Sequence, residues 1–221
     1  EPISFRYPLV EALTAGLFLA SWLVWSEESV ARAILGMVFV ALLIPASFID
    51  LDHMIIPDRF SIGGALTGLV CSFAFPALHG VPTGLFQSHF VSGLEGFLGF
   101  LVGTAVIYWV GTIFEILLRK PAMGEGDWKL LGAVGAFCGW QGAVFGLFGG
   151  AFIGVLIVLP LMAARGRGNE KGTGEKEEEK EGDGEEGEGE EGIGFGVQVP
   201  FGPMLAMGGV LYYLFLRDWV D

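Results

Sequence analysis

Long apolar runs constrain this chain more than any other feature. A helix that crosses a bilayer needs about 20 mostly apolar residues. The sequence offers seven candidate runs, at 8–25, 29–49, 60–78, 91–118, 128–141, 142–164 and 201–216. They are continuous and lack the alternation of membrane barrel strands, so we predict helices. The break at Gly139-Trp140-Gln141 divides an apolar stretch, 128–164, that is too long for one crossing.

These runs predict an all-α fold, a polytopic transmembrane helix bundle of about seven helices. The chain is 52% hydrophobic without counting its 36 glycines, which agrees with an integral membrane protein. The distribution of Lys and Arg predicts its orientation. If the N-terminus is cytoplasmic, ten of the twelve lie on the cytoplasmic side, and only Arg32 and Arg217 lie outside. The loops 50–59, 119–127 and 165–200 are then all expected to face the cytoplasm.

The segment 165–200 differs from the rest of the chain. Residues 169–192 hold twelve Asp and Glu against three Lys, which accounts for −9 of the net charge of −13. So polar a segment cannot bury enough surface to offset its ordering entropy, and we predict a disordered acidic loop. The expected organisation is therefore a set of membrane-embedded helices over 1–164, this Gly/Glu-rich loop over 165–200, and a final transmembrane helix of the same domain over 201–221.

Composition and spacing argue against several classes of site. Cys71 and Cys138 lie in separate apolar runs without CxxC spacing, so we interpret both as buried thiols. No His, Cys or Asp cluster has metal-ligand spacing, and no basic and aromatic pattern indicates nucleic-acid binding. The chain opens on Glu1-Pro2-Ile3, without an initiator Met or a signal peptide. We expect it to begin inside a longer protein.

Two acids are the candidate chemical groups. Asp50, at the end of the second run, and Asp127, at the start of the fifth, are predicted to emerge on the same face at similar depth. Acids at a membrane boundary are costly unless they are paired or solvated, and they often mark function. Interfacial solvation is the alternative for either acid taken alone. Two acids with distinctive flanks favour a shared site.

The flanks of these acids form two motifs. Pro57 disfavours helix at Ile56 and predicts a short turn, and Gly124 and Gly126 let an extended peptide approach the second acid. The motifs read Asp50-Leu51-Asp52-His53-Met54-Ile55-Ile56-Pro57-Asp58 and Gly124-Glu125-Gly126-Asp127-Trp128-Lys129-Leu130. Together they resemble the type IV prepilin leader peptidases, which are GxGD intramembrane aspartyl proteases. The resemblance extends over nearly the whole chain, through Arg6-Tyr7-Pro8-Leu9-Val10-Glu11 and Pro200-Phe201-Gly202-Pro203.

The resemblance implies an aspartic endopeptidase whose catalytic residues are Asp50 and Asp127. Asp52 and Asp58 compete for the first role, but only Asp50 precedes the Pro by the family spacing. The implied substrate is the leader of a type IV prepilin or pseudopilin, cut at the cytoplasmic face of the bacterial inner membrane. Two carboxylates that share a proton can hydrolyse a peptide bond, one as base and one as acid, and the sequence leaves the two roles open. The residues expected to bind substrate are Gly124, Gly126, Lys129, Pro57 and Asp58.

The resemblance also has departures. The family's usual first helix and its domain of paired CxxC motifs, associated with zinc and with N-methylation of the new pilin terminus, have no counterpart in this sequence. We therefore expect no cofactor for the peptidase activity, and S-adenosylmethionine and zinc only if that domain exists in the full-length protein. The acidic loop is longer than the family leads us to expect. The expected partners are the prepilin substrate and the lipid bilayer, with no nucleic acid.

Two alternatives remain open from the sequence. One is an ion- or proton-coupled transporter in which Asp50, Asp127 and Glu115 form a pathway. A transport pathway would be expected to place carboxylates through the membrane depth, whereas Asp50 and Asp127 are predicted on one face. The other alternative is a bifunctional peptidase that also N-methylates the mature pilin.

Overall fold

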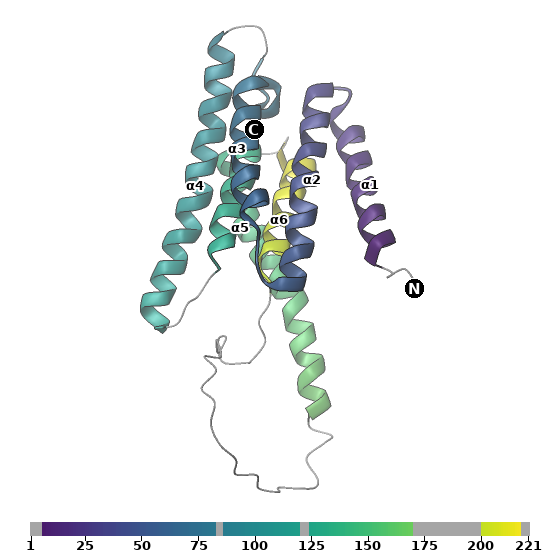
Figure 1. Cartoon of the computed structure of the whole chain (residues 1–221), viewed down its shortest axis with the longest axis vertical. Helices are drawn as coiled ribbons and strands as arrows, with labels where there is room; N and C mark the ends of the chain where they lie inside the picture. The colour runs from purple at the N-terminus through teal and green to yellow at the C-terminus, as the bar shows by residue number, and fades with distance from the viewer. Residues whose placement is uncertain (1–5, 83–85, 120–123, 170–199, 218–221) are drawn as a thin grey trace, which may run out of the picture. The chain divides into compact units, whose positions relative to one another are not determined.

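The computed structural model describes residues 6–82, 86–119, 124–169 and 200–217, and these residues form helices and no strand. A 3-10 turn, η1 (Pro76–His79), and a π-helical turn, η2 (Tyr212–Leu216), accompany the α-helices. The predicted all-α class is confirmed. In chain order the α-helices are α1 (Arg6–Trp25), α2 (Val30–His53), α3 (Asp58–Ala74), α4 (Phe86–Leu118), α5 (Glu125–Asn169) and α6 (Gly202–Leu211) (Figure 1).

Four of these helices are long and apolar enough to cross a membrane: α1, α2, α4 and α5 as far as Pro160. The helix α3 has 17 residues, and α6 adds its π-helical turn to only 10 residues. The backbone of α5 is interrupted at Gly139, which has φ 77° and ψ −179°. The expected number of about seven helical segments is obtained when the two parts of α5 are counted separately.

The turn between α2 and α3 is shorter than the predicted loop 50–59. The helix α2 continues through His53 and ends where Met54 adopts the left-handed conformation, with its N–H bonded to the carbonyl of Asp50. Pro57 then precedes the first residue of α3. Pro57 restricts only the residue before it, so nothing in the sequence ends α2 as early as Asp50. Asp50 therefore lies in the last turn of a helix, and not in a loop as predicted.

Other boundaries also differ from the prediction. The run 60–78 is not one helix, because α3 ends at Ala74 and Pro76, which has no N–H to donate, begins η1. The helix α4 begins at Phe86, five residues before the predicted start at 91. The loop predicted over 119–127 ends earlier, since Glu125 opens α5 and places Asp127 in its first turn.

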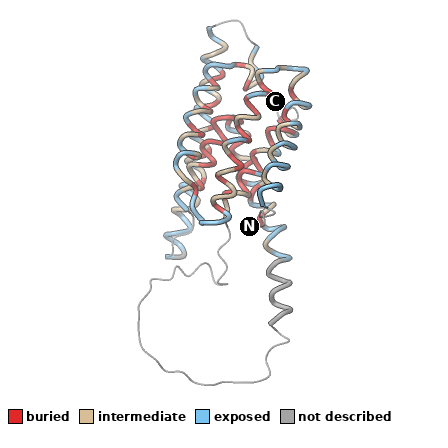
Figure 2. Tube along the Cα trace, turned by 45° about the vertical axis from the view of Figure 1, so that its right-hand side comes forward, coloured by how far each residue is buried: buried red, intermediate tan, exposed pale blue. Residues whose placement is uncertain are grey.

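The helix α2 is central to the packing, with contacts to α1, α3 and α6. Buried residues gather where helices face one another, shown in red in Figure 2. Glycines bring the backbones of α4, α5 and α6 together. A β-carbon at Gly99 in α4 would lie 2.1 Å from the carbonyl oxygen of Gly135 in α5, and one at Gly208 in α6 would lie 2.6 Å from that of Gly146. Such small residues allow close helix packing where no hydrophobic effect drives helices together.

The chain divides into two compact units, and α5 passes from one to the other. Residues 1–153 and 200–221 form the first, which contains both candidate acids, and residues 154–199 form the second. In the second unit the structure describes the end of α5, which includes Pro160. The acidic segment lies, from residue 170 onward, outside the described residues, so its disorder stays a prediction.

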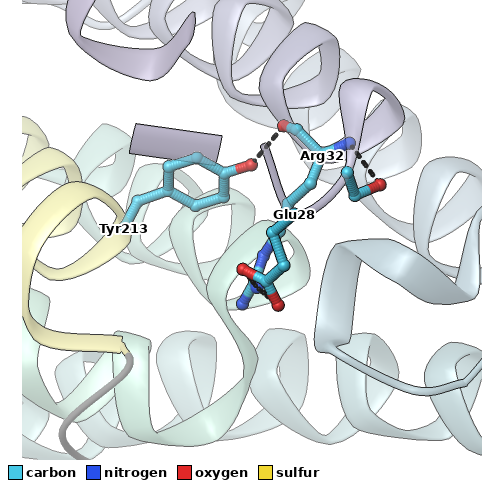
Figure 3. A network of polar contacts seen from close by, with 4 residues as sticks. Glu28, Arg32 and Tyr213 are labelled. Atoms are coloured by element: carbon cyan, nitrogen blue, oxygen red, sulfur yellow. Dashed lines mark hydrogen bonds and ion pairs between the residues drawn. The ribbon is translucent and has the colours of Figure 1, made fainter. Parts of the chain in front are cut away.

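A polar network centred on the buried Arg32 lies at the start of α2, at the opposite end of that helix from Asp50. Arg32 is 3% exposed, and its Nη1 lies 3.1 and 3.0 Å from the two carboxylate oxygens of Glu28. Its guanidinium also lies 3.8 Å from the ring centroid of Trp25. Tyr213 donates its O–H to the Arg32 carbonyl at 2.7 Å, which ties η2 to α2 (Figure 3). Arg32 and Arg217, the two arginines predicted on the outer side of the membrane, are both buried within the protein.

The network extends to His79 in η1. Arg217 donates to Nδ1 of His79 at 3.2 Å, and Nε2 lies 2.8 Å from Oγ of Ser72, which donates to the Ala136 carbonyl. This arrangement fits a neutral ring with its proton on Nε2. Burial lowers the pKa of His79 from 6.5 to about 3, and the positive charges of Arg217 and Arg32 act in the same direction.

Candidate active site

Four chain segments meet where α2 ends. The connector 54–57 places the start of α3 beside the end of α2. At the start of α6, the main-chain N–H of Gly202 reaches the Asp50 side chain. At the start of α5, Gly126 lies against the side chain of Ile56 from the connector. One end of the bundle therefore carries both candidate acids.

The two acids are buried at this end. Asp50 is 5% exposed and Asp127 is 8% exposed. They come from α2 and α5, and they are close enough for an electrostatic interaction between their carboxyl groups. Two carboxyl groups that interact in this way cannot both ionise cheaply, and such a pair can hold one proton between them. The structure thus brings together the two acids that the sequence places on one face.

Each carboxyl group is held by main-chain atoms of a different glycine. Asp50 accepts a hydrogen bond on Oδ2 from the N–H of Gly202, at 3.0 Å. Asp127 donates its N–H to the carbonyl of Gly124 at 3.2 Å, and the Gly124 main chain also hydrogen-bonds the Asp127 carboxyl group. The bond from the Gly124 main chain to the Asp127 side chain is the half of a capping box that a residue at the third helical position supplies, since glycine has no side chain to supply the other half. It restricts the orientation of Asp127 relative to α5.

Ile56 lies between the segments that carry the acids. A β-carbon at Gly126 would lie 2.7 Å from Cβ of Ile56, and a β-carbon at Gly202 would lie 2.8 Å from its Cδ1. Ile56 itself is only 7% exposed. Its side chain therefore fills the space between the residue before Asp127 and the residue that binds Asp50, and it sets their separation.

The competing acids have different surroundings. The side chain of Asp52 is 38% exposed and forms an ion pair with Arg6. The side chain of Asp58 is 62% exposed and pairs with Lys129, with Oδ1 2.8 Å from Nζ. Both are therefore surface carboxylates engaged by cations, whereas Asp50 is buried beside Asp127.

The residues predicted to bind substrate all lie at this end of the bundle. Pro57 is the residue before α3, and Lys129 joins α5 to α3 through Asp58. Gly124 is exposed next to Asp127, whereas the space beside Gly126 is filled by Ile56 of the same chain. An approaching peptide therefore has more room at Gly124 than at Gly126.

Sequence reasoning missed Gly202 and Ile56. A signal for Gly202 was present, because the last apolar run was predicted to begin on the same face as the two acids, with Gly202 next to Pro203 at its start. No comparable signal distinguished Ile56 from Ile55. Ile55 is 65% exposed, and only the packed structure shows which of the two neighbours faces inward.

Comparisons with known proteins agree with the resemblance. A 137-residue stretch is 42% identical to the "Type 4 prepilin-like proteins leader peptide-processing enzyme" of Escherichia coli O78:H11, covering 62% of this chain and 46% of that protein. The "Prepilin leader peptidase/N-methyltransferase" of Xanthomonas campestris pv. campestris is 28% identical over all 221 residues and 63% of its own length. That of Aeromonas hydrophila is 37% identical over 72% of this chain and 51% of its own length.

The chain thus spans roughly half to two thirds of the length of these curated relatives. No solved structure shows significant similarity to it. The type IV leader peptidase family matches residues 37–159, a stretch that includes both Asp50 and Asp127. Since this match covers more than half of the chain, the protein belongs to the type IV leader peptidase family.

Proposed function

We propose that this chain is an intramembrane aspartyl endopeptidase that removes the leader peptide of type IV prepilins or pseudopilins. The single observation that carries the proposal is the pair of buried, interacting carboxyl groups, Asp50 and Asp127, contributed by two helices at one end of the bundle. Family membership supplies the substrate class.

The proposed chemistry uses one proton shared by the two acids. The ionised member removes a proton from water as the water attacks the scissile carbonyl, and the other member hydrogen-bonds or protonates the carbonyl oxygen. The peptide bond then breaks as the leaving amine takes up a proton. Burial of both groups strengthens their electrostatic effect on the reacting atoms, because little water screens it.

The surroundings of the acids fit a peptide that arrives extended. Gly124 is exposed beside Asp127 and offers main-chain atoms without a side chain in the way. Asp52 and Asp58, near the end of α2 and at the start of α3, are held only by exposed ion pairs with Arg6 and Lys129, and the cations of a basic leader can replace these partners at little cost. The excess of Lys and Arg in the loops at this end supports a cytoplasmic position in the bacterial inner membrane.

The test is cleavage of a prepilin by the purified chain in detergent. Asp50→Asn and Asp127→Asn remove the carboxylates but keep the side-chain shape, so each should lower kcat by at least roughly 10²-fold. Glu115→Gln is the matched control, since it removes an exposed acid near the end of α4 and should leave cleavage unchanged. Near-normal cleavage by either Asn variant, in a folded protein, would exclude that residue from the mechanism.

The names of several relatives also contain "N-methyltransferase", which makes methylation the second candidate function. The two cysteines of this chain cannot form the paired CxxC motifs associated with that activity. We therefore expect the 221-residue chain, incubated with prepilin and S-adenosylmethionine, to release mature pilin with an unmodified terminal amine. A product heavier by one methyl group in mass spectrometry would instead assign the transfer to these helices.

A further inference from the structure

We propose that the main-chain N–H of Gly202 positions Asp50 for the reaction, which makes the start of α6 part of the active site. This inference rests on the proposed function for its catalytic meaning. The hydrogen bond to Oδ2 is 3.0 Å long, is buried, and joins residues 152 positions apart in the chain. The other carboxylate oxygen of Asp50, Oδ1, takes no part in this hydrogen bond.

The local sequence makes this N–H available. The first N–H groups of a helix have no partner within the helix. At the start of α6, Met204 and Leu205 donate to the carbonyl of Phe201, both at 3.1 Å. Pro203 has no N–H. The N–H of Gly202 is therefore the first-turn donor that can serve Asp50, and it lies at the positive end of the helix dipole.

The position requires glycine for a steric reason. A β-carbon at residue 202 would lie 2.6 Å from Oδ2 of Asp50 and 2.8 Å from Cδ1 of Ile56. Both distances are well inside van der Waals contact, so any side chain there displaces the carboxylate, Ile56 or the start of α6. Since Ile56 also lies against Gly126, the displacement would reach the segment that carries Asp127.

A donor of this kind has two effects on a catalytic carboxylate. A hydrogen bond from an N–H stabilises the charged form of a carboxylate more than the neutral acid. It also restricts the rotation of the carboxyl group, so that one oxygen keeps a defined direction toward the reacting atoms. Because misplacement of a reacting group by about 1 Å can cost roughly 10²-fold in rate, we expect loss of this contact to lower kcat more than it raises KM.

The first experiment measures prepilin cleavage by Gly202→Ala. We expect kcat per folded enzyme to fall by roughly 10- to 100-fold, with KM changed far less. Gly209→Ala is the matched control in the same helix, because its β-carbon would lie 2.8 Å from Cγ1 of Val134, away from both acids. It should lower thermal stability but keep kcat. A Gly202→Ala variant with the wild-type kcat would overturn the proposal.

A second variant separates positioning from simple packing. Ile56→Val deletes Cδ1, the Ile56 atom nearest to the added β-carbon, but leaves the conflict with Oδ2 of Asp50. If Gly202 positions Asp50, the double variant Gly202→Ala/Ile56→Val keeps the low kcat of Gly202→Ala relative to Ile56→Val alone. If Gly202 only makes room for Ile56, the double variant regains activity, and the proposal is wrong.

A stability measurement tests the contact without any cleavage assay. Gly202→Ala should lower the unfolding temperature less in an Asp50→Ala background, because the carboxylate that conflicts with the new β-carbon is gone. This comparison also applies if Gly202→Ala fails to fold in the wild-type background. An equal loss of unfolding temperature in both backgrounds would show that the added β-carbon does not meet the Asp50 carboxylate, and the proposal would be wrong. Failure of the wild-type chain to cleave prepilin would instead count against the proposed function, and the two failures are thus distinguishable.

Discussion

Three aspartates lie between positions 50 and 58, and their surroundings differ. Asp50 is buried and bonded to a main-chain N–H, whereas Asp52 and Asp58 are exposed and paired with Arg6 and Lys129. Exposed ion pairs contribute little free energy because water and salt screen them. The cations of a substrate can therefore replace Arg6 and Lys129 beside the two exposed acids, whereas the buried Asp50 is suited to chemistry that needs a carboxylate shielded from water.

This difference predicts a graded response to substitution. Asp52→Asn and Asp58→Asn should each raise KM for a prepilin with a basic leader by a few-fold, with kcat close to normal, because only long-range attraction is lost. A higher ionic strength should raise the wild-type KM in the same way, since salt screens that attraction. Steady-state kinetics at two salt concentrations checks both effects. An inactive Asp52→Asn together with an active Asp50→Asn would move the catalytic role by two residues.

His79 provides a second prediction at the residue scale. Its pKa is lowered to about 3 in the folded protein, chiefly by burial, so below pH 6.5 the unfolded state binds a proton that the folded state does not. The free energy of unfolding is therefore unaffected by protonation of His79 above pH 6.5, and it decreases as the pH falls from 6.5 toward 3. The unfolding temperature in detergent should fall between about pH 7 and pH 5, and His79→Gln should weaken that dependence.

The control for this prediction is His89→Gln. His89 is partly exposed and contacts the Phe73 carbonyl through Nδ1 at 2.9 Å. The comparison of the two variants shows whether the slope of unfolding temperature against pH depends on His79 itself or on the loss of any histidine. Equal slopes in the wild type and His79→Gln would show that protonation of His79 does not contribute to acid destabilisation.

At the scale of the elements, α5 depends on a change of direction at Gly139. Residues on both sides of it meet, since a β-carbon at Gly146 would lie 3.2 Å from Cδ1 of Leu131. The two parts of α5 thus pack on each other within the first unit. The backbone angles of Gly139, φ 77° and ψ −179°, belong to a region that is essentially restricted to glycine.

Gly139→Ala should therefore destabilise the protein by about 1–3 kcal/mol. The cause is backbone strain and not a clash, because the nearest atom to an added β-carbon, Oε1 of Gln141, lies 3.4 Å away. Gly63→Ala in α3 is the control. An added β-carbon there meets nothing within 4 Å, and it should be neutral or stabilise by about 0.5–1 kcal/mol. Thermal unfolding of the two variants checks the contrast, and an equal effect would contradict it.

At the scale of the whole molecule, the acidic segment carries most of the net charge but none of the proposed chemistry. Replacement of residues 169–192 by a neutral Gly/Ser linker of equal length should preserve prepilin cleavage in detergent, because we predict the segment to be a solvated tether. The readout is kcat/KM of the replaced chain against the wild type. A large loss would show that the segment has a specific partner or contacts the enzyme.

The amino-acid sequence by itself determined the helical class, the break at Gly139 and the meeting of Asp50 and Asp127 at one end of the bundle. These features follow from local properties: the length of apolar runs, the conformational freedom of glycine and the alternation of helix direction along the chain. The family motifs, which are also local, identified the acids and the family now shown by the comparisons.

Only the tertiary structure decided how the acids are held. The helix α2 extends past Asp50, since Pro57 restricts only its immediate neighbour. The Asp50 carboxyl group is buried because the start of α6 packs on it, whereas Asp52 in the same turn is exposed. The bond from Gly202 and the position of Ile56 depend on which faces of α2, α5 and α6 pack together. That choice is made by contacts between residues far apart in the chain, and no periodicity or spacing in a single segment records it.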